Sequence, residues 1–237
     1  MTNNRLTPQF TPDCTKGETA FGWFWLLVHM FVLPLLFAVL IEKTTAISSE
    51  LTVNYMYYGI SLVMVMLVFL KMLRREFDHL LDRFWLCVKT FFAGYCFWYA
   101  MSLAMAGIMT ALGIDSTPPN DQAIDVLAQE NFGGVMAISV IAAPIVEEIL
   151  FRGVLFQSIR KRSRVWAYVA SLAMFGLYHT WQFALLYQDP VYLLYSLQYI
   201  PITFVLTWCY ERSGSLWTSI FFHATNNYLA MQVLQMM

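Results

Sequence analysis

Charged residues are scarce in this chain, and their scarcity excludes most kinds of soluble protein. Only 12% of the 237 residues are Asp, Glu, Lys or Arg, whereas 59% are hydrophobic. A soluble domain carries about 25% charged residues. The net charge of −1 also leaves no basic excess that would bind a nucleic acid. We therefore expect an integral membrane protein that has the lipid bilayer, and no nucleic acid, as a partner.

Cysteines are also few, and no linker, low-complexity run or internal repeat divides the chain. Cys14, Cys87, Cys96 and Cys209 show neither paired nor metal-type spacing. Because three of the four fall in or beside apolar runs, buried thiols are favoured over disulfides or zinc ligands. The absence of a repeated half argues against a transporter built from inverted repeats. We treat residues 1–237 as a single integral membrane domain.

Long apolar runs, in contrast, fill most of the sequence. A membrane-spanning helix needs about 20 mostly apolar residues, and a barrel strand needs about half that number in an alternating pattern. The predicted fold class is all-α: a polytopic transmembrane helical bundle of about seven helices, with an eighth if the long third run contains two crossings. The runs are 20–41, 52–70, 84–112, 132–157, 165–187, 191–209 and 215–235.

The basic residues between these runs predict an orientation. They fall in two places, after the second run and after the fourth: Lys71, Arg74, Arg75 and Arg83, then Arg160, Lys161, Arg162 and Arg164. By the positive-inside rule both places are cytoplasmic, and so is the N-terminus. The segment from Asp115 to Asn131 has acidic residues and no Lys or Arg, which suits the opposite side.

Four charged residues lie inside the predicted spans. Lys89 is close to the end of its span and can extend its ammonium group to the interface. Glu147, Glu148 and Arg152 have no such route, and an ionised group at membrane depth costs several kcal/mol, so these residues mark a site unless they form a purely structural triad. Glu148 and Arg152 have the i,i+4 spacing of an ion pair. Glu147, rotated by about 100° on a helix, stays free.

Three further polar residues are predicted at a similar depth. With a helical rise of 1.5 Å per residue, Glu147 lies about 15 Å from the cytoplasmic end of its span, His223 about 13 Å, Asn227 about 19 Å and His179 about 21 Å. This convergence favours a site in the cytoplasmic half of the bilayer, whose cavity we expect to open toward the cytoplasm. His29 and His79 have no other polar residues predicted at a similar depth near them, and they are interpreted as structural.

These side chains suit hydrolysis without a covalent intermediate. Burial of a carboxylate in an apolar wall favours its protonated form, so Glu147 could accept a proton from water and later return it to a leaving amine. An imidazole N–H or an asparagine amide could stabilise the oxyanion. No HExxH motif is present, no Asp lies inside a span, and Ser171 and Ser219 lack a nearby base.

Three motifs resemble those of a known family. The sequence EEILFRG at 147–153 matches EExxxR(G), FGLYH at 175–179 matches FxxxH, and HATNN at 223–227 matches HxxxN. Over residues 130–235 the chain thus resembles the catalytic core of the CAAX protease and bacteriocin-processing family (CPBP or Abi) of intramembrane glutamate endopeptidases, related to the type II CAAX prenyl endopeptidases.

The resemblance implies a role for each matching residue. Glu147 would be the general base, assisted by His179. His223 and Asn227 would form the oxyanion hole, and Glu148 with Arg152 would order the site. It also implies a membrane-associated peptide or lipidated protein as substrate, of the bacteriocin, pheromone or CAAX type. The short chain suggests a bacterial plasma membrane. No cofactor is expected.

Two alternatives remain open at this point. A zinc protease could use Glu147, His179 and His223 as ligands and leave a fourth position free. A non-catalytic immunity, binding or transport protein could use the same buried polar cluster. The oligomeric state is not predicted.

Overall fold

The computed structural model of the protein describes residues 14–43, 50–114 and 117–236, which are helical and contain no strand. The helices join into seven rods within these ranges, as the sequence predicts. Four rods are single helices: α3 (Glu50–Asp82), α4 (Phe84–Ala111), α8 (Arg164–Leu186) and α10 (Leu216–Met236). The other three combine several helical segments: α1 (Lys16–Leu27) with the π-helix η1 (Val28–Val32) and α2 (Leu33–Lys43); α5 (Pro119–Ala137) with η2 (Ile138–Ala142), α6 (Ala143–Glu147), η3 (Glu148–Phe156) and α7 (Gln157–Arg160); and the 3₁₀-helix η4 (Pro190–Tyr199) with α9 (Ile200–Ser213).

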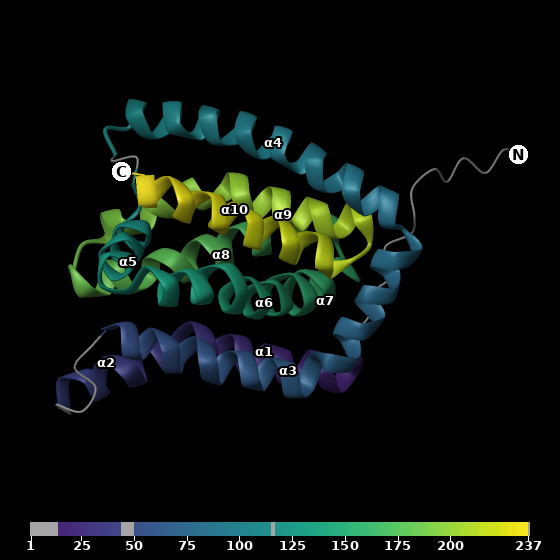
Figure 1. The fold of residues 1–237 in the computed structure, drawn as a ribbon, viewed down its shortest axis with the longest axis horizontal. Coiled ribbons are helices and arrows are strands. Elements are labelled where there is room, and N and C mark those ends of the chain that lie inside the picture. The colour runs from purple at the N-terminus through teal and green to yellow at the C-terminus, as the bar shows by residue number, and fades with distance from the viewer. Residues whose placement is uncertain (1–13, 44–49, 115–116, 237) are drawn as a thin grey trace, which may run out of the picture.

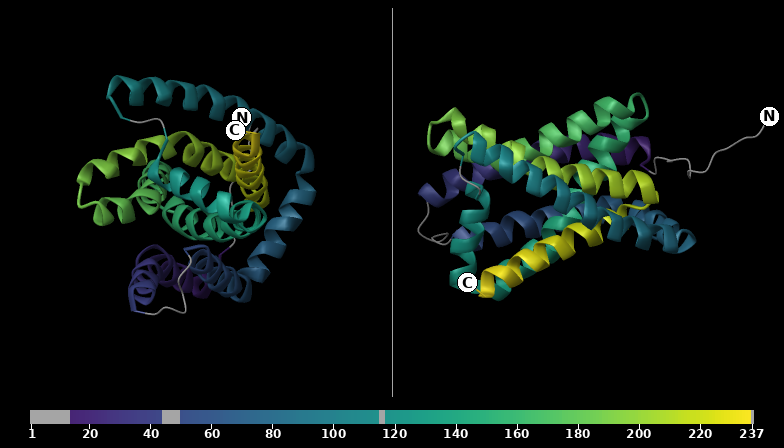
Figure 2. Two further views of the ribbon diagram at one scale, coloured as in Figure 1. Left: turned by 60° about the vertical axis from the view of Figure 1, so that its left-hand side comes forward. Right: turned by 90° about the horizontal axis from the view of Figure 1, so that it is seen from above.

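The rods lie side by side in layers (Figure 1). The rod of α1 and α2 and the helix α3 form one layer, α8 to α10 and the rod from α5 to α7 form the middle, and α4 lies on the far side against α9 and α10. Figure 2 shows α4 curving around the outside of the bundle. In its most apolar stretch only 6% of α4 is buried, against 56% for the rod 119–160. The rod 119–160 is therefore the central element.

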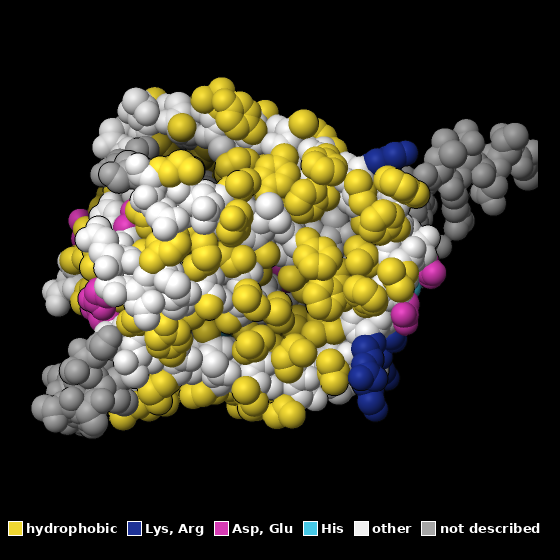
Figure 3. Space-filling model, in the orientation of Figure 1, with side chains coloured by type: hydrophobic (Ala, Val, Ile, Leu, Met, Phe, Trp, Pro, Cys, Tyr) yellow, Lys and Arg dark blue, Asp and Glu magenta, His cyan; other side chains and the backbone are white. Residues whose placement is uncertain are grey.

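Five of the described rods are long and apolar enough to span a membrane: Lys16–Leu40, Glu50–Asp82, Phe84–Ala111, Pro119–Arg160 and Pro190–Ser213. The face shown in Figure 3 is mostly hydrophobic between its two ends, as lipid contact requires. The protein is an integral membrane protein. The rods α8 and α10, which carry the histidine and asparagine motifs, fall outside these five because polar residues lower their mean hydropathy.

The two ends of the bundle differ in charge. We call the end with the junctions at 83, 161–163 and 214–215 the basic end, because Arg83 and the residues 160–164 lie there. The other end holds the start of α3, the start of α5 and the end of α10, with Glu50, Asp121 and Asp125, and we call it the acidic end. Figure 3 shows Lys and Arg only near the basic end.

Three predicted boundaries need correction. Lys71, Arg74 and Arg75 lie on α3 and not in a loop, because α3 continues to Asp82 with one side buried. The segment predicted to connect the third and fourth spans is helical from Pro119. The long third run is the single helix α4, so its described residues contain no eighth crossing. Asp115 lies outside the described residues.

A kink divides α5 where the sequence predicts the start of a span. Asn131 has non-helical angles, φ −152° and ψ 84°, and its side-chain Oδ1 accepts a hydrogen bond of 2.9 Å from the Gly134 N–H. This is the geometry of a side chain that caps a helix start. The rod thus starts again at the predicted residue 132, and the first part of α5 is a separate helix at the acidic end.

All four cysteines are free thiols. Cys87 and Cys209, which lie in or beside apolar runs, are buried as predicted, whereas Cys96 is exposed. Cys14 is also buried, although it lies in the polar N-terminal stretch. Cys96 lies on α4, whose outer side has no helix against it, and this explains the wrong expectation of burial.

Two glycines permit close contact between rods that surround the site. A Cβ atom at Gly22 of α1 would lie 2.4 Å from Val154 of η3, and one at Gly176 of α8 would lie 2.9 Å from the Ser196 carbonyl oxygen of η4. Both distances are far below van der Waals contact, so no larger residue fits without a shift of its neighbours. These contacts hold η3 and α8, which carry two of the three motifs, against the bundle.

Candidate active site

The two adjacent glutamates lie between two wide turns of the central rod. Glu147 ends the five-residue helix α6, and Glu148 begins the π-helix η3; a second π-helix, η2, precedes α6. Short π-helical segments within α-helices are rare and occur frequently at functional sites. Here η2 precedes the short helix that ends at Glu147, and η3 begins at Glu148.

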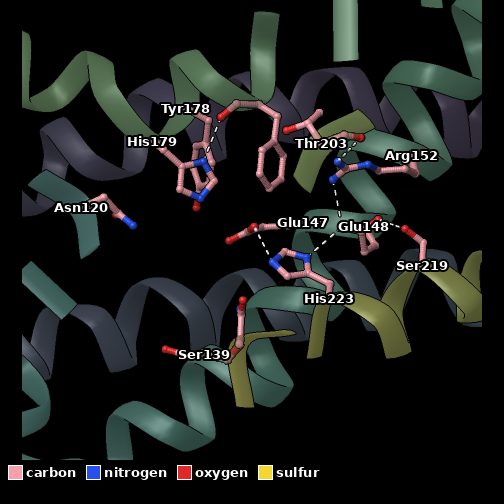
Figure 4. A network of polar contacts seen from close by, with 12 residues as sticks. Asn120, Ser139, Glu147, Glu148, Arg152, Tyr178, His179, Thr203, Ser219 and His223 are labelled. Carbon is pink, nitrogen blue, oxygen red and sulfur yellow. Dashed lines mark hydrogen bonds and ion pairs between the residues drawn. The ribbon is translucent and has the colours of Figure 1, made fainter. Parts of the chain in front are cut away.

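Glu148 lies in a closed network in which both of its oxygens have partners (Figure 4). Arg152 Nη1 donates to Oε1 at 2.9 Å, the contact that the i,i+4 spacing predicts, and the Ser219 hydroxyl donates to Oε2. The Arg152 guanidinium also donates to the Thr203 carbonyl at 3.4 Å and lies 4.5 Å from the centre of the Phe175 ring. Glu148 and Arg152 are fully buried. Each charge therefore has a partner, as a buried ion pair requires.

Glu147 has a different environment, because only one of its oxygens is hydrogen-bonded. The Tyr58 hydroxyl of α3 donates to Oε1 at 3.0 Å, whereas Oε2 is buried without a hydrogen-bond partner. His223 Nε2 lies 3.9 Å from Oε2, which is too long for a hydrogen bond. Buried polar atoms in proteins normally have partners. Among the buried side-chain atoms of the described residues that lack one, Glu147 Oε2 is the only carboxylate oxygen.

His223 lies between the two glutamates. Its Nδ1 is 2.9 Å from Glu148 Oε1, and its Nε2 faces Glu147 (Figure 4). A carboxylate accepts, so Nδ1 carries a proton in this contact. Glu148 thereby fixes the orientation of the ring, in the manner of a carboxylate that orients a catalytic base.

His179 reaches the same region from α8. Its Nδ1 lies 2.9 Å from the Phe175 carbonyl oxygen, which can only accept, so Nδ1 is protonated and Nε2 is left for another partner. The ring stacks on Tyr199 with centroids 4.4 Å apart. The described contacts of Glu147 are with Tyr58 and His223 and do not include His179. The assistance of Glu147 by His179 therefore stays a prediction.

Asn227 lies one turn beyond His223 on α10 and is held by the central rod. Its Nδ2 donates to the Ser139 carbonyl oxygen of η2 at 2.8 Å. Asn226 also faces the cavity described below. The four predicted residues Glu147, His179, His223 and Asn227 thus come from three rods and meet at one cavity.

This cavity has a volume of about 1270 Å³ and begins at Glu147 and His223. It reaches the acidic end at Glu50 and Asp121, whose side chains are exposed. No Lys or Arg is among the described residues that line it, and neither are Glu148 and Arg152. The ion pair thus lies behind the cavity wall, whereas Glu147 forms part of its surface.

The direction of the cavity sets two of the predictions against each other. Its lining residues lie on the side of Glu147 that is remote from the basic loops. If the basic end faces the cytoplasm, the cavity reaches the opposite side of the membrane. The predicted orientation and a cavity that opens toward the cytoplasm are therefore incompatible. The estimate of depth counts residues along each helix, so it says nothing about which side of the bundle is open.

Several residues of the site were missed from the sequence. Tyr58 is one of three tyrosines in the apolar run 52–70, and buried tyrosine hydroxyls usually find a partner, but the sequence does not show which one. Ser219 was considered as a nucleophile, whereas it donates to Glu148. His29 was interpreted as isolated, yet it is buried and contacts Ser61, Tyr57 and Tyr178.

The described side chains do not form a grouped set of three His, Cys, Asp or Glu metal ligands. Of the candidate zinc ligands, His223 and Glu147 are neighbours, while each histidine already uses its Nδ1 in another contact. A metal would bind through the two Nε2 atoms and Glu147.

Fold and site together define a class: a polytopic helical membrane protein with a buried glutamate and two histidines at an internal cavity. Residues 129–229 match the family model described as type II CAAX prenyl endopeptidase Rce1-like, so the chain carries a domain of this family. The segment contains all three motifs, and the family identification made from them is confirmed. Comparison with curated proteins and with solved structures gives no match. The family supports a protease that acts on peptides or prenylated proteins in a membrane environment.

Proposed function

We propose that the protein is an intramembrane endopeptidase in which Glu147 activates water for attack on a peptide bond. The observation that carries this proposal is the buried Oε2 atom of Glu147, which has no partner and lies at a cavity opposite His223 Nε2. A carboxylate with a structural role would have both oxygens satisfied, as Glu148 does.

The chemistry follows from the positions of the cavity residues. Glu147 takes a proton from water as the resulting hydroxide attacks the peptide carbonyl, and it returns that proton to the leaving amine. The Asn227 amide donates to the oxyanion, as does His223 when it carries a proton on Nε2 as well as on Nδ1. His179, with Nε2 available, orients the attacking water. Glu148 and Arg152 keep the His223 ring in place.

The catalytic core is residues 130–235, within a single membrane domain of residues 1–237. This combination accounts for Tyr58, which comes from outside the core and donates to Glu147. The substrate is a membrane-associated peptide or lipidated protein, of the bacteriocin, pheromone or CAAX type, in a bacterial plasma membrane with the N-terminus in the cytoplasm. The mostly apolar cavity wall suits such a chain.

The decisive experiment compares two glutamine variants of the purified protein in lipid nanodiscs. Glu147→Gln keeps an acceptor for Tyr58 but cannot take a proton, so cleavage of a fluorogenic peptide that the unmodified protein cleaves should fall about 10²- to 10⁴-fold. The control Glu130→Gln changes an exposed carboxylate that does not line the cavity, and it should leave the rate unchanged. Full activity of Glu147→Gln would overturn the proposal.

The same preparation separates the proposal from its alternatives. We propose catalysis without a metal, because the three candidate ligands are not grouped around a common centre. Stoichiometric zinc in the purified protein, together with loss of activity in chelator that added zinc restores, would instead establish a zinc protease. A non-catalytic immunity or binding protein would retain its cellular phenotype in Glu147→Gln.

A further inference from the structure

A chain of hydrogen-bonding side chains leads through the protein interior to Glu147. It runs from Ser61 through His29, Tyr178 and Tyr58 to the Glu147 carboxylate. We infer that His29 is a positioning residue for Glu147, acting through Tyr178 and Tyr58. This inference rests on the proposed role of Glu147 as general base.

The contacts are continuous. Ser61 Oγ lies 2.8 Å from His29 Nδ1, and His29 Nε2 lies 3.1 Å from the Tyr178 hydroxyl. The Tyr178 and Tyr58 hydroxyls are 3.2 Å apart, and Tyr58 donates to Glu147 Oε1 at 3.0 Å. The residues come from η1, α3, α8 and α6, so the chain joins four helical segments.

Counting protons gives the chain one direction. Each hydroxyl has a single proton, and Tyr58 uses its proton on the carboxylate. The Tyr58 oxygen then accepts from Tyr178, and the Tyr178 oxygen accepts from His29 Nε2–H. His29 Nδ1 is therefore the acceptor for the Ser61 hydroxyl. One tautomer of His29 satisfies each contact of the chain from Ser61 to Glu147, and all donors of this chain point toward Glu147.

Tyr57 completes the surroundings of His29 without interrupting this direction. Its hydroxyl donates to the His29 backbone carbonyl oxygen at 2.8 Å, so its proton is not available to the ring. The Tyr57 oxygen lies 3.0 Å from His29 Nε2 and accepts from the same N–H as Tyr178 does at 3.1 Å. Its ring stacks on the imidazole with centroids 4.6 Å apart, and Tyr178 stacks at 5.4 Å. The imidazole is fully buried and held by stacking on both tyrosines. Its orientation is fixed by its neighbours.

The position of His29 separates positioning from substrate binding. Tyr58 and Tyr178 line the cavity, whereas His29 and Ser61 do not. A substrate therefore cannot touch His29. If His29 acts through the chain, its loss should lower kcat by weakening the donor that holds Glu147, and it should leave KM unchanged.

The test uses full-length protein in nanodiscs, the fluorogenic peptide and rates normalised to the folded fraction. His29→Leu should lower kcat about 10- to 100-fold, the range typical of groups that orient an active residue, with KM unchanged. His29→Gln, which keeps a side-chain N–H donor, should restore most of kcat. Tyr95→Phe is the matched control, because it removes a tyrosine hydroxyl that has no partner and does not line the cavity.

A double variant shows whether His29 acts through the tyrosines. Tyr58→Phe breaks the chain at its last link, so adding His29→Leu should lower kcat no further. Ser61→Ala gives an independent test if His29→Leu fails to fold, and kcat should again fall while KM stays constant. An unchanged kcat in His29→Leu or in Ser61→Ala, or full additivity with Tyr58→Phe, would overturn the inference.

The outcome is distinct from a failure of the proposed function. If Glu147→Gln is inactive while His29→Leu has normal kcat, the general base stands and the positioning role is wrong. If Glu147→Gln is fully active, the proposed function itself is wrong.

Discussion

Two regions of the bundle bury a carboxylate, and they do so differently. At the basic end, Glu76 of α3 is only 1% exposed, and both of its oxygens accept: Oε1 from the Tyr210 hydroxyl at 2.9 Å and Oε2 from the Leu216 N–H at 2.7 Å. The second bond caps the start of α10 with a side chain from another helix. Near the middle, Glu147 is 2% exposed, yet one of its oxygens has no partner.

The difference shows that burial of a carboxylate is not enough to indicate chemistry. Glu76 does not line the cavity, and its partners are structural groups. Glu147 faces a cavity beside a histidine. The residue that is both buried and incompletely paired, at a place a substrate can reach, is the candidate for function.

The largest effect on stability is expected at Glu148, which is fully paired like Glu76 but adjoins the site. Glu148→Gln leaves the buried Arg152 without a counter-charge, and the free energy of unfolding should fall by about 3–5 kcal/mol. Thermal unfolding in detergent measures this loss. Because removal of both charges avoids an unpaired one, adding Arg152→Met should recover much of the stability, and a double variant as unstable as the single one would contradict this account.

The next largest effect is expected on kcat, at the cavity beside Glu147. Asn227→Ala removes a proposed oxyanion donor, and kcat should fall about 10²- to 10³-fold. Its neighbour Asn226 also lines the cavity and provides a matched control, so Asn226→Ala should change kcat little. Peptide-cleavage kinetics of both variants measure the difference. Equal losses of kcat in the two variants would contradict the assignment of Asn227 as an oxyanion donor.

A smaller effect is expected at the basic end. Glu76→Gln replaces a charged acceptor and should lower the free energy of unfolding by about 1–3 kcal/mol. The kcat of the folded protein should stay unchanged, because Glu76 has no contact with the cavity. Unfolding curves and kinetics on the same sample measure both quantities. If Glu76→Gln lost kcat without losing stability, Glu76 would not be the structural carboxylate that contrasts with Glu147.

The last test measures accessibility instead of stability or kcat. It decides which side of the membrane each end of the bundle faces. In a Cys96→Ser background, Gln122→Cys marks the acidic end and Lys161→Cys marks the basic end, and both positions are exposed. By the positive-inside rule an impermeant maleimide should label Gln122→Cys in intact cells and Lys161→Cys only in opened membranes. The reverse pattern would reject the predicted orientation and place the cavity mouth on the cytoplasmic side.

Much of the fold was predictable because a membrane-spanning helix needs a long apolar run, which the sequence displays directly. The number of rods and most of their boundaries follow from this rule. It failed at Lys71 to Asp82, where α3 continues beyond its apolar run with only one side buried, and at Pro119, where a polar segment is helical. Hydropathy detects the apolar part of a helix that can span a membrane, and it misses polar helical residues beyond that part.

The candidate site was predictable where a local pattern or a buried charge exposed it. The contact of Glu148 with Arg152 is a local i,i+4 pair, and the glutamates and motif histidines are conspicuous in apolar runs. The contact of His223 with Glu148 joins residues 75 positions apart, and the contact of Tyr58 with Glu147 joins residues 89 positions apart. Which residues meet across the bundle depends on how each helix is rotated, and the sequence alone does not fix that rotation.

The two π-helices of the central rod have a consequence for mutational tolerance. Each residue turns an α-helix by about 100°, so an insertion or deletion normally re-aims every later side chain. Here α6, with Glu147 at its end, is a single short stretch between η2 and η3, both of which hold extra residues per turn. A one-residue deletion within η2 can convert that π-helix to an ordinary α-helical turn, so the later side chains keep their directions. The same deletion in α6 removes a residue from an ordinary α-helix, so it would rotate Glu147 away from His223.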